Sequence, residues 1–134
     1  APRVTLTAKS CTYSGARTHE PGEFEIDAEN TTSHAASFAF YELAPGFSIK
    51  DVRGFFQRVI RGENVKPPTP ADFRWNEVWS HAGPRATTRV PLNVSARRLV
   101  IVCMENRAAD TRPSSEGVWP HPAAIYVPTQ LEIR

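Results

Sequence analysis

The stretch FEIDAENTTSHAASFAFYEL, residues 24–43, carries the clearest structural signal in the chain. Its first seven residues alternate between apolar and polar side chains, which is typical of a half-buried β-strand. Residues 36–43 are apolar at successive positions in the middle, which favours a central strand covered on both faces. Four polar residues separate the two segments, and the last of them is His34. The stretch therefore predicts two strands joined by a short polar corner.

Similar strand patterns occur on both sides of this stretch. Residues 4–13 alternate and predict one further strand. Residues 97–105 contain the continuous apolar run LVIV, which favours a second central strand. In the last strand Pro128 indicates an edge position or a bulge, because proline has no N–H to give to a ladder. The remaining predicted strands cover residues 86–94 and 123–133.

One segment has a helical period instead. Ser48 followed three residues later by Asp51 is the pattern of an N-terminal capping box. After it, apolar residues recur at spacings of three and four along one face of a helix. We therefore expect one inserted α-helix at about residues 48–61, with its apolar stripe packed on the core. The stripe consists of Ile49, Val52, Phe55, Phe56, Val59 and Ile60.

Two long connections interrupt the pattern. Residues 63–85 contain Pro67, Pro68 and Pro70, and we expect them to be irregular because proline does not fit the centre of a sheet. Residues 106–122 are expected to form a loop. The whole pattern predicts an all-β sandwich of about seven strands with one helix, in a single domain spanning residues 1–134.

Composition excludes several functions. Of the 134 residues, 22% are charged, and the net charge of +2 comes from scattered arginines. No stripe of basic and aromatic residues is present, which argues against binding to nucleic acid. No apolar run approaches 18 residues, so we expect no membrane span. We also find no combination of nucleophile, base and oxyanion donor, and therefore expect a protein that is not an enzyme.

Three residues have the order and the chemistry of a copper site. His34 follows a predicted strand, Cys103 ends the most buried strand, and His121 precedes the last strand. A type 1 copper site uses two imidazoles and one thiolate with a weak axial group. The alternative for His34 is a polar residue in a loop with no ligand to bind.

On these residues the sequence resembles the cupredoxin, or blue copper protein, family, as a divergent member. EPGEFEIDAENTTSHAASFAF resembles the family's turn, its strand ending in asparagine and its first histidine. LVIVC resembles the strand that delivers the copper thiolate, and GVWPHPAAIYV resembles the segment with the second histidine. The resemblance implies a cupredoxin-like Greek-key sandwich whose first strand runs parallel to the strand before His34.

The resemblance also implies a copper centre and a place of work. The ligands would be His34, Cys103 and His121, with Ile125 or Tyr126 at the axial position. Such a site implies electron transfer with a redox protein partner, across an apolar patch around His121 that includes Trp119 and Pro120. In a metal-free module the partner surface would instead be the segment 63–85, with Trp75 and Trp79, together with the loop at 106–120. Members of this family work in the periplasm or outside the cell, so we expect export, with a signal peptide already removed.

A second cysteine leaves an alternative open. In this fold Cys11 lies at the end of the sandwich where the copper would bind. A disulfide between Cys11 and Cys103 would remove the thiolate. The chain would then be a metal-free cupredoxin-like module for binding or structure, in which Cys11 and Cys103 are bonded or simply buried.

Overall fold

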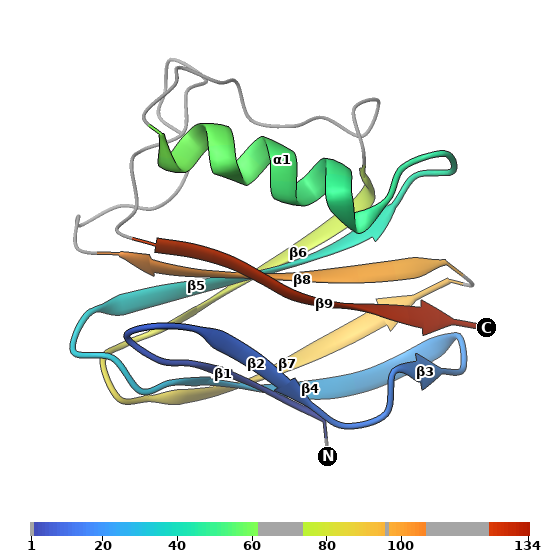
Figure 1. Cartoon of the computed structure of the whole chain (residues 1–134). Helices are drawn as coiled ribbons and strands as arrows, with labels where there is room; N and C mark the ends of the chain where they lie inside the picture. Colours follow the sequence, from blue (N-terminus) through green and yellow to red (C-terminus); the bar gives the residue numbers. More distant parts are fainter. Residues whose placement is uncertain (1, 62–73, 96, 107–123) are drawn as a thin grey trace.

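In the part of the chain that the structure describes, two β-sheets face each other, and one helix covers the outer face of the larger one (Figure 1). This is a computed structural model, and it describes residues 2–61, 74–95, 97–106 and 124–134. The order of the layers is therefore helix, five-stranded sheet and four-stranded sheet. The predicted all-β sandwich with one inserted helix is confirmed.

The smaller sheet has the strand order β2-β1-β4-β7. Strand β1 is antiparallel to β2 and parallel to β4, with Leu6 opposite Asn30. This parallel pairing confirms the arrangement that the cupredoxin resemblance implied. The strands are β1 (Arg3–Leu6), β2 (Cys11–Ser14), β4 (Gly22–Asn30) and β7 (Thr87–Val94).

The larger sheet has the strand order β3-β9-β8-β5-β6. Its central strands β8 and β5 are antiparallel, with Cys103 opposite Phe38. The strands are β3 (Thr18–His19), β5 (Ala35–Leu43), β6 (Arg74–Ala82), β8 (Arg98–Asn106) and β9 (Ala124–Ile133).

The chain passes between the sheets several times. Strands β5 and β6 lie in the larger sheet, and β7 then returns to the smaller sheet to pair with β4. Strand β8 crosses back and pairs with β5. In the series β5, β6, β7 and β8, the fourth strand thus returns to lie beside the first. This return is typical of a Greek key, and it confirms the predicted topology.

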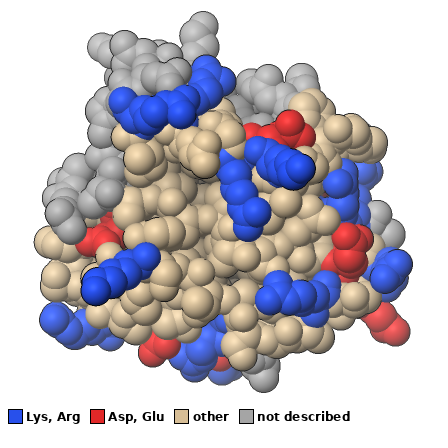
Figure 2. Space-filling view, viewed as in Figure 1, with Lys and Arg blue, Asp and Glu red and all other residues tan. Residues whose placement is uncertain are grey.

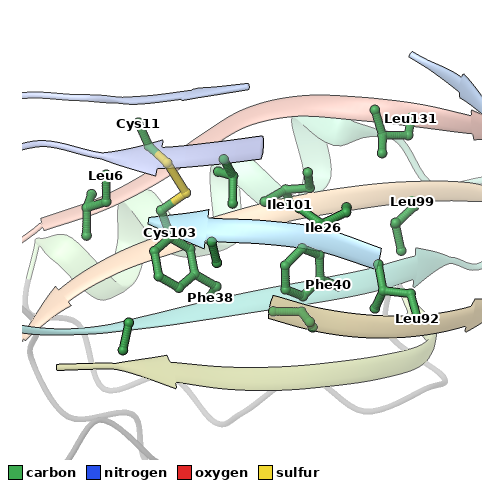
Figure 3. Close-up of a cluster of buried hydrophobic side chains, with 14 of the residues drawn as sticks. Leu6, Cys11, Ile26, Phe38, Phe40, Leu92, Leu99, Ile101, Cys103 and Leu131 are labelled. Carbon is green, nitrogen blue, oxygen red and sulfur yellow. A yellow bond between two sulfur atoms is a disulfide. The ribbon is translucent and has the colours of Figure 1, made fainter. Parts of the chain in front are cut away.

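The alternation within β5 and β8 divides the core into two parts. One set of side chains, including Phe38, Phe40 and Ile101, fills the space between the sheets (Figure 3). The opposite set, including Tyr41 and Val102, packs under the helix. Both strands are therefore covered on both faces, as their apolar sequences predicted.

Helix α1 spans Ile49–Ile60 and begins as predicted. The Ser48 hydroxyl accepts a hydrogen bond from the N–H of Lys50, and the Asp51 carboxylate accepts one from the N–H of Ser48. These two bonds belong to a complete capping box. The helix buries Val52, Phe56 and Val59 against the sheet. Among the described residues, no helix is long and apolar enough to cross a membrane.

Two strand predictions were wrong. Residues 4–13 do not form one strand, because a turn separates β1 from β2. The Thr7 hydroxyl accepts hydrogen bonds from the N–H groups of Lys9 and Ser10, and the N–H of Thr7 donates to the carbonyl of Ser10. A threonine side chain thus supplies the turn in a segment that has no glycine or proline.

Strand β6 was missed because it lies inside the segment predicted to be irregular. It pairs with β5 along most of its length, with His81 opposite Ser37. The described residues therefore contain nine strands, one of them only two residues long, where about seven were predicted. The prolines at 67, 68 and 70 precede this strand and lie outside the described residues, as does the predicted loop after residue 106.

Pro128 lies where its chemistry predicts. The pairing between β8 and β9 is interrupted by a register shift between Ile101 and Cys103, next to the proline. On its other side β9 pairs with β3 at only two residues, 132 and 133. Both predicted environments, a bulge and an open edge, are therefore present.

Candidate functional site

The corner between β4 and β5 is held by the side chain of Asn30, which is 0% exposed. Its Oδ1 atom accepts hydrogen bonds from the N–H and the hydroxyl of Thr32, at 3.0 and 2.7 Å. Its Nδ2 atom donates to the carbonyls of His34, Ala82 and Gly83, at 2.7, 3.3 and 3.0 Å. One buried amide therefore joins this corner to the turn after β6.

His34 contributes its backbone to this corner. Its carbonyl accepts from Asn30 and also from the hydroxyl of Thr32, at 2.9 Å. Its N–H donates to the same hydroxyl at 3.3 Å. The imidazole of His34 is half-buried and takes no part in this network.

Cys103 is joined to Cys11 by a disulfide (Figure 3). Cys11 is on β2 and Cys103 on β8, so the bond links the two sheets across the core. Their Cα atoms are 6.5 Å apart, and the side chains are 8% and 0% exposed, respectively. Leu6 and Phe38 lie close to the bond. In this state the Cys103 sulfur is not a thiolate and offers no charge to a metal.

His34 and Cys103 lie at different levels of the sandwich. Cys103 is opposite Phe38. Phe38 is four residues along the chain from His34, which lies in the corner before the first residue of β5. His121 lies outside the described residues. Among the described residues, no group of three or more histidine, cysteine, aspartate or glutamate side chains lies close enough together to hold a metal ion.

The side chains proposed for the axial position face opposite ways. Tyr126 is opposite Cys103 and packs against the core between the sheets. Ile125 packs into the cluster under the helix, together with Met104. The described residues around Cys103 thus present a bonded cystine and no free thiolate.

The proposed partner surface is described only in part. Trp119 and Pro120 lie outside the described residues, and so does the side chain of Trp75. Trp79 is half-buried in the cluster under the helix, with its ring edge toward Tyr41 at 6.2 Å between centroids. Its indole N–H donates to the carboxylate of Glu77 at 2.9 Å.

A polar row on β5, β6 and β8 did not emerge from the sequence. The hydroxyl of Ser37 is 2.9 Å from Nδ1 of His81 and accepts from the amide of Asn106 at 3.3 Å. Strand pairing assembles this row, and β6 was not predicted. Although serine and histidine are in contact, Ser37 is 0% exposed, so its hydroxyl cannot reach a substrate as a nucleophile.

The second feature that the sequence did not indicate is a groove between α1, the first half of β9 and the start of β2. It has a volume of about 480 Å³. Its apolar lining includes Phe56, Ile60 and Pro128, and Arg53 and Arg61 add two cations. Helical spacing along α1 places residues 53, 56, 57, 60 and 61 on one side. This helical spacing was the one signal in the sequence that could have indicated the groove. It does not show that β9 forms the opposite wall.

Comparison with known proteins gives one structural likeness. No family model matches the chain, and no curated protein sequence matches it. Among solved structures it is similar to dithionite-reduced auracyanin from the photosynthetic bacterium Roseiflexus castenholzii, with 11% sequence identity and a TM-score of 0.47. The match covers 75% of this chain and 81% of that chain.

Proposed function

We propose that this chain is an exported, metal-free cupredoxin-like module, held together by a disulfide and used for binding. The observation that carries the proposal is the bond between Cys11 and Cys103. The bond involves Cys103, which is the only cysteine that the family resemblance implied as a copper ligand. Copper binding and electron transfer through Cys103 would require this bond to be reduced first.

Two further observations support the metal-free state. The corner that carries His34 is held by Asn30 and Thr32 through backbone groups, which explains its polar sequence without a metal. The register of β5 and β8 separates His34 from the level of Cys103.

Export follows from the redox chemistry of the same bond. Disulfides persist in oxidising compartments such as the periplasm and the extracellular space, and are rare in a reducing cytosol. A bond buried between the sheets is part of the folded core. We therefore propose that the protein works in the periplasm or outside the cell.

The proposed role is binding and not catalysis. Within the described part of the chain, the one close serine–histidine pair has a fully buried hydroxyl. A groove of a size that suits a small ligand lies on the helix side of the larger sheet.

Thiol counting tests this proposal. The protein is purified without reductant, unfolded in guanidinium and treated with a chromogenic thiol reagent. We expect no free thiol before reduction and two thiols per chain after it. The Cys11→Ala variant is the matched control, because it must show one free thiol without reduction. Two thiols in unreduced wild-type protein would contradict the proposal.

A further inference from the structure

The groove between α1 and β9 combines an apolar lining with two cations. Its volume of about 480 Å³ lies within the usual range for small-molecule sites, about 300–1,000 Å³. Ile60 belongs to this lining and is 45% exposed, and it is the one large hydrophobic side chain among the described residues that is classed as exposed. An apolar ligand would cover Ile60 together with Phe56 and Pro128.

Arg53 is fixed in place at this groove. Its Nε and one terminal nitrogen both donate to the carbonyl of Val127, at 3.2 and 2.9 Å. A guanidinium has five N–H donors in a rigid fork, so three remain for a ligand. Because the side chain is already held against β9, it loses little freedom when it binds an anion.

The charge of the groove selects the ligand. Among the residues that the structure describes, Arg53 and Arg61 both line it, and no aspartate or glutamate does. In the view of Figure 2, an uncharged area near the centre is bordered by basic side chains and by fewer acidic ones. An anionic head group close to Arg53 is therefore favoured, with an apolar body along the lining.

The edge of β9 argues against an extended peptide as the ligand. A peptide that adds a strand needs free backbone N–H and C=O groups on the edge that it joins. At this edge Pro128 has no N–H, and the carbonyl of Val127 is already bonded to Arg53. Both features are known ways of protecting an open strand edge.

We propose that this groove binds a small amphipathic carboxylate, with the carboxylate on Arg53 and the alkyl chain against Phe56, Ile60 and Pro128. The inference rests on the proposed role as a metal-free binding module, because it names the ligand class of that module. Cys11 also lines the groove. The proposed site therefore belongs to the protein in which the disulfide is formed.

Calorimetric titration of the disulfide-intact protein with octanoate tests this inference. We expect saturable binding at one site. Octanol has the same chain without the charge and should bind about tenfold more weakly or worse, since charge-assisted hydrogen bonds contribute about 1.5–3 kcal/mol. No saturable binding, or equal binding of the two probes, would overturn the proposal.

Variants locate the site. Arg53→Gln should weaken octanoate binding about tenfold, while Arg53→Lys should retain part of it. Ile60→Asp, at an exposed position, should abolish binding without unfolding the protein, as checked by its melting temperature. Arg89→Gln on β7 is the matched control and should leave the affinity unchanged. Wild-type affinity in both Arg53→Gln and Ile60→Asp would exclude this groove.

The two proposals fail in different experiments. Free thiols in the unreduced protein would contradict the metal-free module and would say nothing about octanoate. Absent octanoate binding by protein with no free thiol would overturn the ligand assignment alone.

Discussion

Asn30 is the residue in which sequence pattern and structural role differ most. The spacing of Asn30 and His34 supported the resemblance to a metal-binding family. In the structure Asn30 uses both ends of its amide to hold the corner, and His34 takes part through its backbone. The sequence alone could not separate these roles, because a hydrogen-bonded corner and a ligand-bearing corner need the same polar residues.

Replacing Asn30 should therefore be costly. Asn30→Ala removes the donor for three carbonyls and the acceptor for Thr32 in a fully buried place. We expect the free energy of unfolding to fall by about 2–4 kcal/mol, measured by urea denaturation. Asn93→Ala, at an exposed position on β7, is the control and should change it by about 0.5 kcal/mol at most. A loss of similar size in both variants would contradict the role of Asn30.

Tyr13 should make stability depend on pH in the alkaline range. Burial raises the pKa of Tyr13 above its ordinary value of 10.0, and the nearby Arg17 guanidinium lowers it by a smaller amount. The folded state thus holds the phenolic proton more tightly than the unfolded state. This contribution is complete below pH 10.0 and is lost as pH rises through the folded pKa.

The Tyr13→Phe variant isolates this contribution. It also lacks the hydrogen bond from the Tyr13 hydroxyl to the carbonyl of Ala16, at 2.7 Å. We expect the difference in unfolding free energy between wild type and variant to shrink as pH rises above 10.0, since ionisation disfavours only the wild-type fold. A difference that stays constant across this range would disprove the assignment.

At the scale of elements, the helix was predictable and two strand features were not. Helix α1 has a local signal at each position, from its capping box to its apolar period. The break between β1 and β2 depends on the hydroxyl of Thr7, which looks like any polar residue of an alternating strand. Strand β6 follows a proline-rich segment, and its place is set by pairing with β5, far away in sequence.

The capping box can be tested by one exchange. Ser48→Ala removes the acceptor for the N–H of Lys50 at the start of α1. We expect a loss of about 1 kcal/mol in unfolding free energy, together with a lower melting temperature. Ser48→Asn keeps a capping side chain and should restore most of the stability. Equal losses in the two variants would show that the cap does not stabilise the helix.

At the scale of the whole molecule, the disulfide joins two sheets that are otherwise held by apolar packing. It connects residues 92 positions apart in sequence, so it strongly restricts the unfolded chain. The layers, the parallel pairing of β1 with β4 and the central positions of β5 and β8 followed from hydrophobic pattern and family resemblance. Whether Cys103 is free or bonded did not follow, because its environment is apolar in either state.

Removing the disulfide should lower stability without changing the fold. We expect the Cys11→Ala/Cys103→Ala variant to lose about 4.6 kcal/mol in unfolding free energy, as loop-closure entropy predicts for a loop of this size. Far-ultraviolet circular dichroism should retain the β-sheet spectrum. Reduction of the wild-type protein should give a similar loss of stability, and unchanged stability in both cases would mean that the bond is not formed.

The central claim is that this cupredoxin-like sandwich works without copper because its cysteine is bonded to a second cysteine. The most direct test is a copper(II) titration of the unreduced protein, followed by absorption in the visible range. We predict no intense thiolate-to-copper band. An intense band that saturates at one equivalent would contradict the account and identify Cys103 as a copper ligand, with His34 and His121 as the histidines to test next.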